Sequence, residues 1–244
     1  MSDIDWLVAR PVAHRGLHDG KSIIENTPSA FVAAIAGCYG IECDLQITAD
    51  GEALVHHDDA LDRLTDGNAR LDAMTAAELK RISFRSSSDR MITLGELCDL
   101  VSGRSTLVIE LKSRFNGDHR LAARTADVLS GYRGPAAVMS FDPWQIAALR
   151  EIAPTLRRGI VAESRRGRTD GEHPASAGAR YCERLLRMRP QFIAYAVNDL
   201  PSLMTFVASR LLQLPILAWT VRGTIEREKA RRHADQMIFE GFRP

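Results

Sequence analysis

The chain has 244 residues, of which 45% are hydrophobic and 26% are charged, and its formal net charge is +1. This length suits one large globular domain with a sizeable core. The near-neutral charge and the lack of long basic runs argue against a nucleic-acid partner, because proteins that bind nucleic acid concentrate Lys and Arg on one face.

The sequence also carries no sign of export or of a membrane anchor. Its N-terminal segment lacks the basic region and the following apolar region of a signal peptide. No apolar run reaches the roughly 18 residues of a membrane-spanning helix. The four cysteines lie far apart and form no CxxC pair. We therefore expect a cytoplasmic protein with reduced cysteines and no stable membrane anchor.

Short apolar segments alternate with helical patterns along the chain. Strands are predicted at residues 11–14, 41–45, 53–57, 106–111, 136–139, 158–162, 192–196, 215–219 and 235–239. Helices are predicted at residues 27–36, 75–82, 93–101, 119–129, 143–152, 177–187, 200–211 and 224–232. In the segment 200–211, the helical period places Leu203, Phe206, Val207 and Leu211 on one face.

Segment 53–57 follows a turn and is expected to return alongside 41–45, which leaves eight strands with helices between them. This pattern favours an α/β fold, a (β/α)8 TIM barrel that spans residues 1–244 as a single domain. A doubly wound open sheet is the runner-up, although it would normally have fewer strands. The polar region at about 59–91 is predicted to be a small insertion between strand 2 and helix 2. In a barrel, such an insertion lies at the carboxyl ends of the strands, where active sites form.

The stretch around residues 41–45 is the first with chemical character. Glu42 and Asp44 alternate with the apolar Ile41, Cys43 and Leu45. Side chains two apart on a strand point the same way, so the two carboxylates share one face. Burying them together costs energy unless a cation or a proton offsets their repulsion, and a divalent ion with oxygen ligands is the usual solution. Taken alone, the pair also fits a solvated edge strand.

Other polar side chains stand where predicted strands end. His14 and Arg15 end the first strand, His57 ends the return segment, and Glu110 and Lys112 end the strand at 106–111. The carboxyl ends of barrel strands meet on one face, so these residues are expected to converge with the acid pair. Three acids, two histidines, an arginine and a lysine are unlikely to converge at one end of a barrel by chance. Their positions therefore predict an active site.

Several motifs follow one another in a specific order. They are HRG at 14–16, ENTPSAF at 25–31, IECDLQITADG at 41–51, HDDALDRLTDG at 57–67, ITLGEL at 92–97, IELK at 109–112, SFDP at 140–143 and WTV at 219–221. In this order and spacing they resemble the glycerophosphodiester phosphodiesterases. The resemblance implies a barrel with an insertion after strand 2, a divalent metal ion, and hydrolysis of small glycerophosphodiesters to glycerol 3-phosphate and an alcohol.

The resemblance also assigns roles, residue by residue. It implies metal ligands at Glu42, Asp44 and Glu110, acid/base histidines at His14 and His57, and phosphate contacts from Arg15 and Lys112. Carboxylate ligands suit Mg²⁺, Ca²⁺ or Mn²⁺. The cations would offset the charge of the phosphodiester, while one histidine removes a proton and the other donates one to the departing oxygen.

Three residues near the proposed acid/base histidines are candidates for lesser roles in the site or for structural positions outside it. His56 and His57 are adjacent, so only one can point inward from a strand, and the H-D pair of the family selects His57. His56 is then a packed or surface residue. Asp58 is a candidate partner for one of the histidines. His18 is a candidate for the mouth of the site, although a role there is the less favoured reading.

Three further residues are candidates for the pocket or its ends. Glu25 and Asn26 match the family motif, while Asn26 or Thr27 is also a natural cap for the helix that follows. Trp219 ends a strand and is a candidate for an apolar wall of the site, with a core position as the alternative. Residues 239–244 depart from the threonine-aspartate ending of many family members, which leaves the alcohol or glycerol pocket undefined.

Two other functions fit the same sequence. One is a phospholipase D-like enzyme that acts on lysophospholipids or releases a cyclic phosphate. The other is a barrel that binds phosphodiesters without cleaving them, although such a protein would be expected to lack a histidine or an acid that this chain retains.

Overall fold

Eight parallel strands close into a barrel in the computed structural model, which describes residues 4–164 and 188–244. Strand β1 pairs with both β2 and β9, which closes the sheet and leaves no open edge among the eight. The predicted (β/α)8 barrel is therefore confirmed, and the open sheet is wrong. The eight strands are β1 (Val12–Ala13), β2 (Gly40–Ile47), β4 (Leu107–Leu111), β5 (Ala136–Ser140), β6 (Arg157–Ala162), β7 (Phe192–Ala196), β8 (Ile216–Val221) and β9 (Gln236–Phe239).

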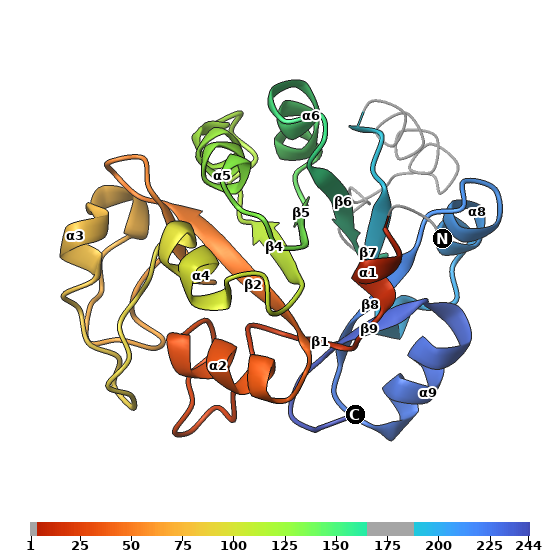
Figure 1. Ribbon diagram of the computed structural model, residues 1–244, viewed down its shortest axis with the longest axis horizontal. Coiled ribbons are helices and arrows are strands. Elements are labelled where there is room, and N and C mark those ends of the chain that lie inside the picture. Colours follow the sequence, from red (N-terminus) through yellow and green to blue (C-terminus); the bar gives the residue numbers. More distant parts are fainter. Residues whose placement is uncertain (1–3, 165–187) are drawn as a thin grey trace, which may run out of the picture.

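Helices surround the barrel in the order that the sequence pattern predicts (Figure 1). Thr27, Thr93, Asp142 and Ser202 each accept a backbone N–H with their side chains, so these residues determine where four of the helices begin. The helix predicted at 177–187 lies outside the described residues. The outer helices are α2 (Pro28–Ala36), α4 (Leu94–Val101), α5 (Arg120–Ser130), α6 (Pro143–Ile152), α8 (Leu203–Arg210) and α9 (Thr224–His233).

Helix α1 (Asp5–Val8) closes the amino-terminal end of the barrel, a role that the sequence pattern did not indicate. Its Leu7 is 1% exposed and packs in a cluster with inward-facing strand residues such as Val108 and Phe192. The side chain of Gln236, at the start of β9, donates to the carbonyl oxygen of Val8. A separate apolar layer lies between the strands and the outer helices. The barrel interior is thus filled at one end, and its polar residues gather at the other.

The insertion after β2 forms its own small apolar cluster. Strand β3 (Ala53–Val55) runs antiparallel to β2, with Leu45 opposite Val55, as the turn at 49–51 predicts. The following segment contains η1 (Leu71–Ala73) and α3 (Ala76–Leu79), which is shorter than the helix predicted at 75–82. Its cluster comprises the buried residues Ile24, Leu54, Leu61, Leu71, Leu79, Phe84 and Met91.

Helix α8 does not bury the face that its apolar pattern suggests. Leu203, Phe206 and Leu211 are 80%, 59% and 71% exposed, whereas Thr205 and Ala208 are buried. The fully buried residues of α8 are the small Thr205 and Ala208, three positions apart on one face, and Met204 is partly buried against the core beside them. The helix forms as the apolar period predicts, but the apolar face lies on the exposed side of the helix and not on the packed side.

The close approach of β6 and β7 gives a test of the packing. A Cβ built on Gly159 would lie 2.4 Å from Cζ of Phe192, whose side chain is fully buried. Gly159→Ala should therefore lower the free energy of unfolding by about 1–3 kcal/mol, the usual cost of overpacking. The measurement is urea denaturation.

Gly95→Ala is the matched control. Gly95 lies in α4, and its nearest neighbour to an added Cβ is 3.8 Å away. Because alanine favours helix by up to about 1 kcal/mol over glycine, this change should leave the protein as stable or more stable. Equal effects of the two changes would contradict the packing described for β6 and β7.

Candidate active site

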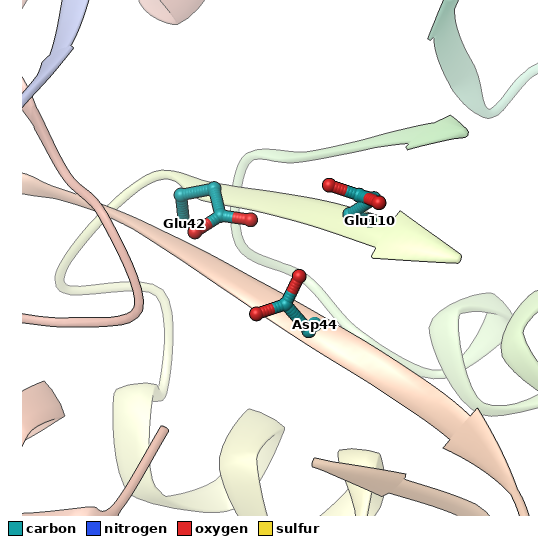
Figure 2. A group of neighbouring side chains, drawn as sticks. All are labelled: Glu42, Asp44 and Glu110. Atoms are coloured by element: carbon teal, nitrogen blue, oxygen red, sulfur yellow. The ribbon is translucent and has the colours of Figure 1, made fainter. Parts of the chain in front are cut away.

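Three carboxylates meet at the carboxyl end of the barrel. Glu42 and Asp44 project from the inner face of β2, and Glu110 projects from β4 two residues beyond the inward-facing Val108 (Figure 2). Strand register sets Asp44 directly beside Glu110. One oxygen from each carboxylate lies within 4.8 Å of the others. The side chains are buried, and the cluster is therefore an enclosed acidic site rather than a solvated acid pair.

Burial and mutual repulsion make this cluster electrostatically costly. Burial, followed by the carboxylates of Asp44 and Glu110, raises the pKa of Glu42 well above its ordinary value. Burial also raises the pKa of Glu110, although Lys112 opposes the shift. Burial acts the same way on Asp44, but there Lys112 and Arg15 outweigh it and the pKa is lowered. The site thus has one well-compensated carboxylate and two that would gain from a further positive charge.

Two cations already contact the cluster. The ammonium of Lys112 lies 2.8 Å from Oδ1 of Asp44 and 2.7 Å from Oε1 of Glu110. Nε of Arg15 lies 3.3 Å from Oδ2 of Asp44, and the backbone N–H of Arg15 donates to Oε2 of Glu42. Burial disfavours the charge on Lys112, yet the two carboxylates raise its pKa and keep it protonated. With all three acids ionised, these two cations leave one negative charge uncompensated.

Each predicted acid/base histidine is held by a carboxylate through Nδ1. Nδ1 of His14 lies 2.7 Å from Oε2 of Glu240, and Nδ1 of His57 lies 2.7 Å from Oδ1 of Asp58. Nε2 of His14 is 4.0 Å from Oε2 of Glu42. A carboxylate on Nδ1 orients the ring and leaves Nε2 for proton transfer.

The other histidines lie apart from this chemistry. His56 is buried, and its Nδ1 bonds to the carbonyl oxygen of Asp58. His57, and not His56, lines the cavity over the carboxylates, and among the described residues His18 does not line it either. Burial lowers the pKa of His57, a shift that the charge of Asp44 opposes. The neutral ring of His57 is therefore favoured near pH 7.

The stretch at 25–27 supports residues of the site through hydrogen bonds. Asn26 donates from Nδ2 to Oδ2 of Asp44 at 2.8 Å and accepts the backbone N–H of Asp44 on Oδ1. Thr27, not Asn26, caps α2. Glu25 accepts a hydrogen bond from the guanidinium of Arg15 at 2.7 Å. Asn26 thus orients Asp44, and Glu25 orients Arg15.

A cavity of about 1000 Å³ opens over these residues. Its lining includes the predicted His14, Arg15, Glu42, His57, Asp58, Glu110, Lys112 and Trp219. Trp219 packs edge-to-face on Phe141, with ring centroids 5.5 Å apart. Trp219 thus lines the cavity and is also partly buried against the apolar cluster inside the barrel. Asp44 and Asn26 lie beneath this surface, where they act on their neighbours.

Glu240 is a site residue that the sequence reasoning missed, and Arg63 is another. The backbone N–H of His14 donates to the carbonyl oxygen of Phe239, so barrel closure brings the residue after β9 beside His14. The signal was present, since Glu240 directly follows the last predicted strand. Arg63, in the insertion, forms ion pairs with both Asp58 and Glu25. No local sequence pattern predicts these contacts.

Fold and site together define a barrel protein with a buried acidic site, suited to a divalent cation and to an anionic ligand. The chain belongs to the glycerophosphoryl diester phosphodiesterase family, whose sequence model matches residues 14–238. The resemblance drawn from the motifs is thereby confirmed.

Individual relatives agree with this assignment. A glycerophosphodiester phosphodiesterase of Caldanaerobacter subterraneus is 31% identical over 160 residues, which cover 62% of this chain and 65% of that protein. Glycerophosphodiester phosphodiesterase 1 of Bos taurus is 42% identical over 74 residues, which cover 30% of this chain and 22% of that protein. The chain thus matches slightly less than two thirds of the length of the bacterial relative.

Solved structures match the fold over nearly the whole chain. A phosphodiesterase of Oleispira antarctica, in complex with the product sn-glycerol-3-phosphate, has a TM-score of 0.81 at 20% identity and covers 97% of this chain and 94% of its own. A glycerophosphodiester phosphodiesterase of Thermotoga maritima has a TM-score of 0.74 at 25% identity, with 94% of each chain covered. Within residues 4–164 and 188–244, no helix combines the length and apolar character needed to cross a membrane.

The contact between Glu240 and His14 predicts a pH-dependent contribution to stability. The hydrogen bond from His14 lowers the pKa of Glu240 from 4.5 to about 2. A depressed folded-state pKa stabilises the fold above the ordinary pKa, and this stabilisation is lost as the pH falls through the folded value. Glu240→Gln should thus unfold at lower urea than the parent at pH 7, and the difference should shrink between pH 4.5 and pH 2.

Glu151→Gln, at an exposed position at the end of α6, is the control and should show no such pH dependence. A Glu240→Gln effect that stays constant from pH 7 to pH 3 would contradict the charged contact with His14.

Proposed function

We propose that this protein hydrolyses glycerophosphodiesters to glycerol 3-phosphate and an alcohol in a metal-dependent reaction. The observation that carries the proposal is the enclosed carboxylate triad, flanked by two cations and by two histidines that are each held by a carboxylate. Membership of the family supports it. The named relatives and the product-bound structure support the substrate class.

The triad fits a divalent ion by its chemistry. Glu42, Asp44 and Glu110 offer three oxygens within 4.8 Å, and hard cations such as Mg²⁺ and Ca²⁺ prefer carboxylate oxygens. Burial and neighbouring carboxylates raise the pKa of Glu42 and of Glu110, and a bound divalent cation would favour the ionised form of both. When bound, the ion would offset the negative charge that builds up on the phosphate oxygens.

The chain's own cations and histidines account for the rest of the chemistry. A phosphodiester resists attack because it is anionic and because its leaving alkoxide is poor. Arg15 and Lys112 line the cavity beside the triad and would bind the phosphate oxygens. Of His14 and His57, one would accept a proton from the attacking hydroxyl, and the other would donate a proton to the departing oxygen.

We propose that the attacking group is the substrate's own hydroxyl, next to the phosphate on the glycerol. Its oxygen would bond to phosphorus as the bond from phosphorus to the alcohol breaks, and water would then open the cyclic phosphate. An intramolecular attack gains a high effective concentration. Ser113 lies two residues beyond the end of β4, but its hydroxyl donates to Asp142 rather than to a histidine, which argues against a serine nucleophile.

A product assay tests the proposed function. Glycerophosphodiesters should yield glycerol 3-phosphate and alcohol with Mg²⁺, Ca²⁺ or Mn²⁺, and excess chelator should abolish turnover. Glu42→Gln should lose both activity and the rise in melting temperature on adding the cation, because the cation binds the folded state. Asp127→Asn, on the exposed side of α5, should keep both. Full turnover in chelator would refute metal dependence.

The two histidines should be needed in opposite protonation states, which gives a bell-shaped dependence of rate on pH. Because burial lowers the pKa of His57, its neutral form should persist to lower pH than in a free histidine. His14→Ala and His57→Ala should each reduce kcat by roughly two to four orders of magnitude. His56→Ala should reduce kcat little, measured per folded molecule. A severe loss in His56→Ala alone would show that the inward histidine is misassigned.

The route through a cyclic phosphate predicts a requirement for the substrate hydroxyl. An analogue that lacks this hydroxyl should bind, because the contacts to the phosphate remain, but it should turn over very slowly. Product analysis of the analogue and of the natural ester is the measurement. Normal turnover of the analogue would mean direct attack by water. Release of unopened cyclic phosphate would favour the phospholipase D-like reaction.

A further inference from the structure

Arg63 extends from the insertion after β2 and lies between two carboxylates. Its Nε donates to Oδ2 of Asp58 at 2.5 Å, and its Nη2 donates to Oε1 of Glu25 at 2.6 Å. Its Nη1 donates to the second oxygen of Glu25 at 3.1 Å. The planar guanidinium thus uses all three of its nitrogens, two of them in a fork on Glu25.

Each of these carboxylates also contacts a residue of the candidate active site. Oδ1 of Asp58 lies 2.7 Å from Nδ1 of His57, the proposed acid/base group. Oε1 of Glu25 accepts a hydrogen bond of 2.7 Å from Nη1 of Arg15, the proposed phosphate ligand. A continuous series of charged contacts therefore runs from His57 through Asp58, Arg63 and Glu25 to Arg15.

Arg63 lies outside the cavity in which a ligand would bind. Neither Arg63 nor Glu25 lines that cavity, whereas His57, Asp58 and Arg15 do. The side chain of Arg63 is 43% exposed, while those of Glu25 and Asp58 are only 12% and 24% exposed. An effect of Arg63 on a reaction in the cavity is therefore transmitted by its two carboxylate partners.

Packing fixes the backbone on both sides of the contact between Arg63 and Glu25. The backbone N–H and the hydroxyl of Thr65 both donate to the carbonyl oxygen of Leu61, which forms a tight turn around Arg63. Leu61 is fully buried in the apolar cluster of the insertion, and this cluster also contains Ile24, the residue before Glu25. An ion pair between two segments that already pack together loses less conformational entropy than one between mobile loops.

The two carboxylates are held in their ionised form by the groups that they join. Burial would raise the pKa of Glu25, but the hydrogen bonds from Arg63 and the charge of Arg15 outweigh it, and the pKa is lowered. Burial acts the same way on Asp58, where the hydrogen bonds from Arg63 and His57 outweigh it. Without Arg63, each carboxylate would lose the contact that fixes its orientation, and the active-site group beside it would gain freedom to rotate.

We propose that Arg63 is a positioning residue, through which the insertion holds the acid/base His57 and the phosphate-binding Arg15 in a fixed relation to each other. The inference rests on the proposed function. Proton transfer and phosphate binding act on the same substrate, so the two groups have to be placed together, and a misplacement of about 1 Å can lower a rate by about 10²-fold. Lysine would keep the charge but not the geometry, because an ammonium lacks the planar fork.

The test measures kcat and KM separately in the intact protein with its metal ion, on the glycerophosphodiester that the parent cleaves fastest. Because His57 acts in the chemical step and Arg15 in binding, Asp58→Asn should mainly lower kcat and Glu25→Gln should mainly raise KM. Arg63→Gln should do both, with kcat lowered by roughly tenfold to a hundredfold. Arg63→Lys should recover only part of the loss.

Arg85→Gln is the matched control. Arg85 belongs to the same insertion and forms an ion pair with Asp66 at 3.4 Å, but it does not line the cavity. This change should alter neither kcat nor KM. A double variant adds a second test: Arg63→Gln combined with Asp58→Asn should lower kcat no further than Asp58→Asn alone, because the two residues act on His57 as one unit.

The outcomes separate this inference from the proposed function. If the parent cleaves no glycerophosphodiester, the proposed function fails, and the inference fails with it. If the parent is active and Arg63→Gln matches Arg85→Gln in both constants, the function stands and the positioning role is wrong. Additive losses of kcat in the double variant would also overturn the role. So would an Arg63→Gln protein that unfolds at lower urea but keeps kcat and KM per folded molecule, because Arg63 would then serve stability alone.

Discussion

The repulsion among three buried carboxylates is the constraint on which the rest of the site depends. Glu42, Asp44 and Glu110 stand together because two inward positions of β2 lie in register with one of β4. Lys112 and Arg15 offset part of the charge, and both also line the cavity where an anionic phosphate would bind. Lys112 and Arg15 therefore stabilise the buried carboxylates in the protein without a ligand, and the same two side chains would contact a bound phosphate. A divalent ion would supply the charge that they leave uncompensated.

Closure of the barrel completes the site from the two ends of the chain. Pairing of β1 with β9 places Glu240 against His14, while the turn after β3 places Asp58 against His57. Two histidines that are distant in sequence thus receive the same support, a carboxylate on Nδ1. Arg63 joins Asp58 to Glu25, and Glu25 in turn holds Arg15. The orientation of His57 and the orientation of Arg15 are thereby linked through the insertion.

The alternating pattern of the chain predicted the barrel, because strand and helix periods and capping residues are local properties. The convergence of Glu42, Asp44 and Glu110 could also be predicted, because polar residues near the carboxyl ends of barrel strands meet on one face. What sequence reasoning missed depends on contacts between distant segments: Glu240 beside His14, Arg63 on Asp58, and α1 across the amino-terminal end. In α8 the sequence pattern predicted a buried face that is in fact exposed. A helical period shows that one face is apolar, but it does not show that this face packs against the barrel. Family resemblance supplied the roles of the residues, which spacing alone left open.

The most direct test of the central claim, that the triad is a divalent-cation site, is anomalous diffraction from crystals of the protein grown with Mn²⁺. The account predicts a manganese peak within coordination distance of carboxylate oxygens of Glu42, Asp44 and Glu110, and its loss in Glu42→Gln. A peak that lies elsewhere, or a site left empty while Lys112 still bridges Asp44 and Glu110, would contradict the account.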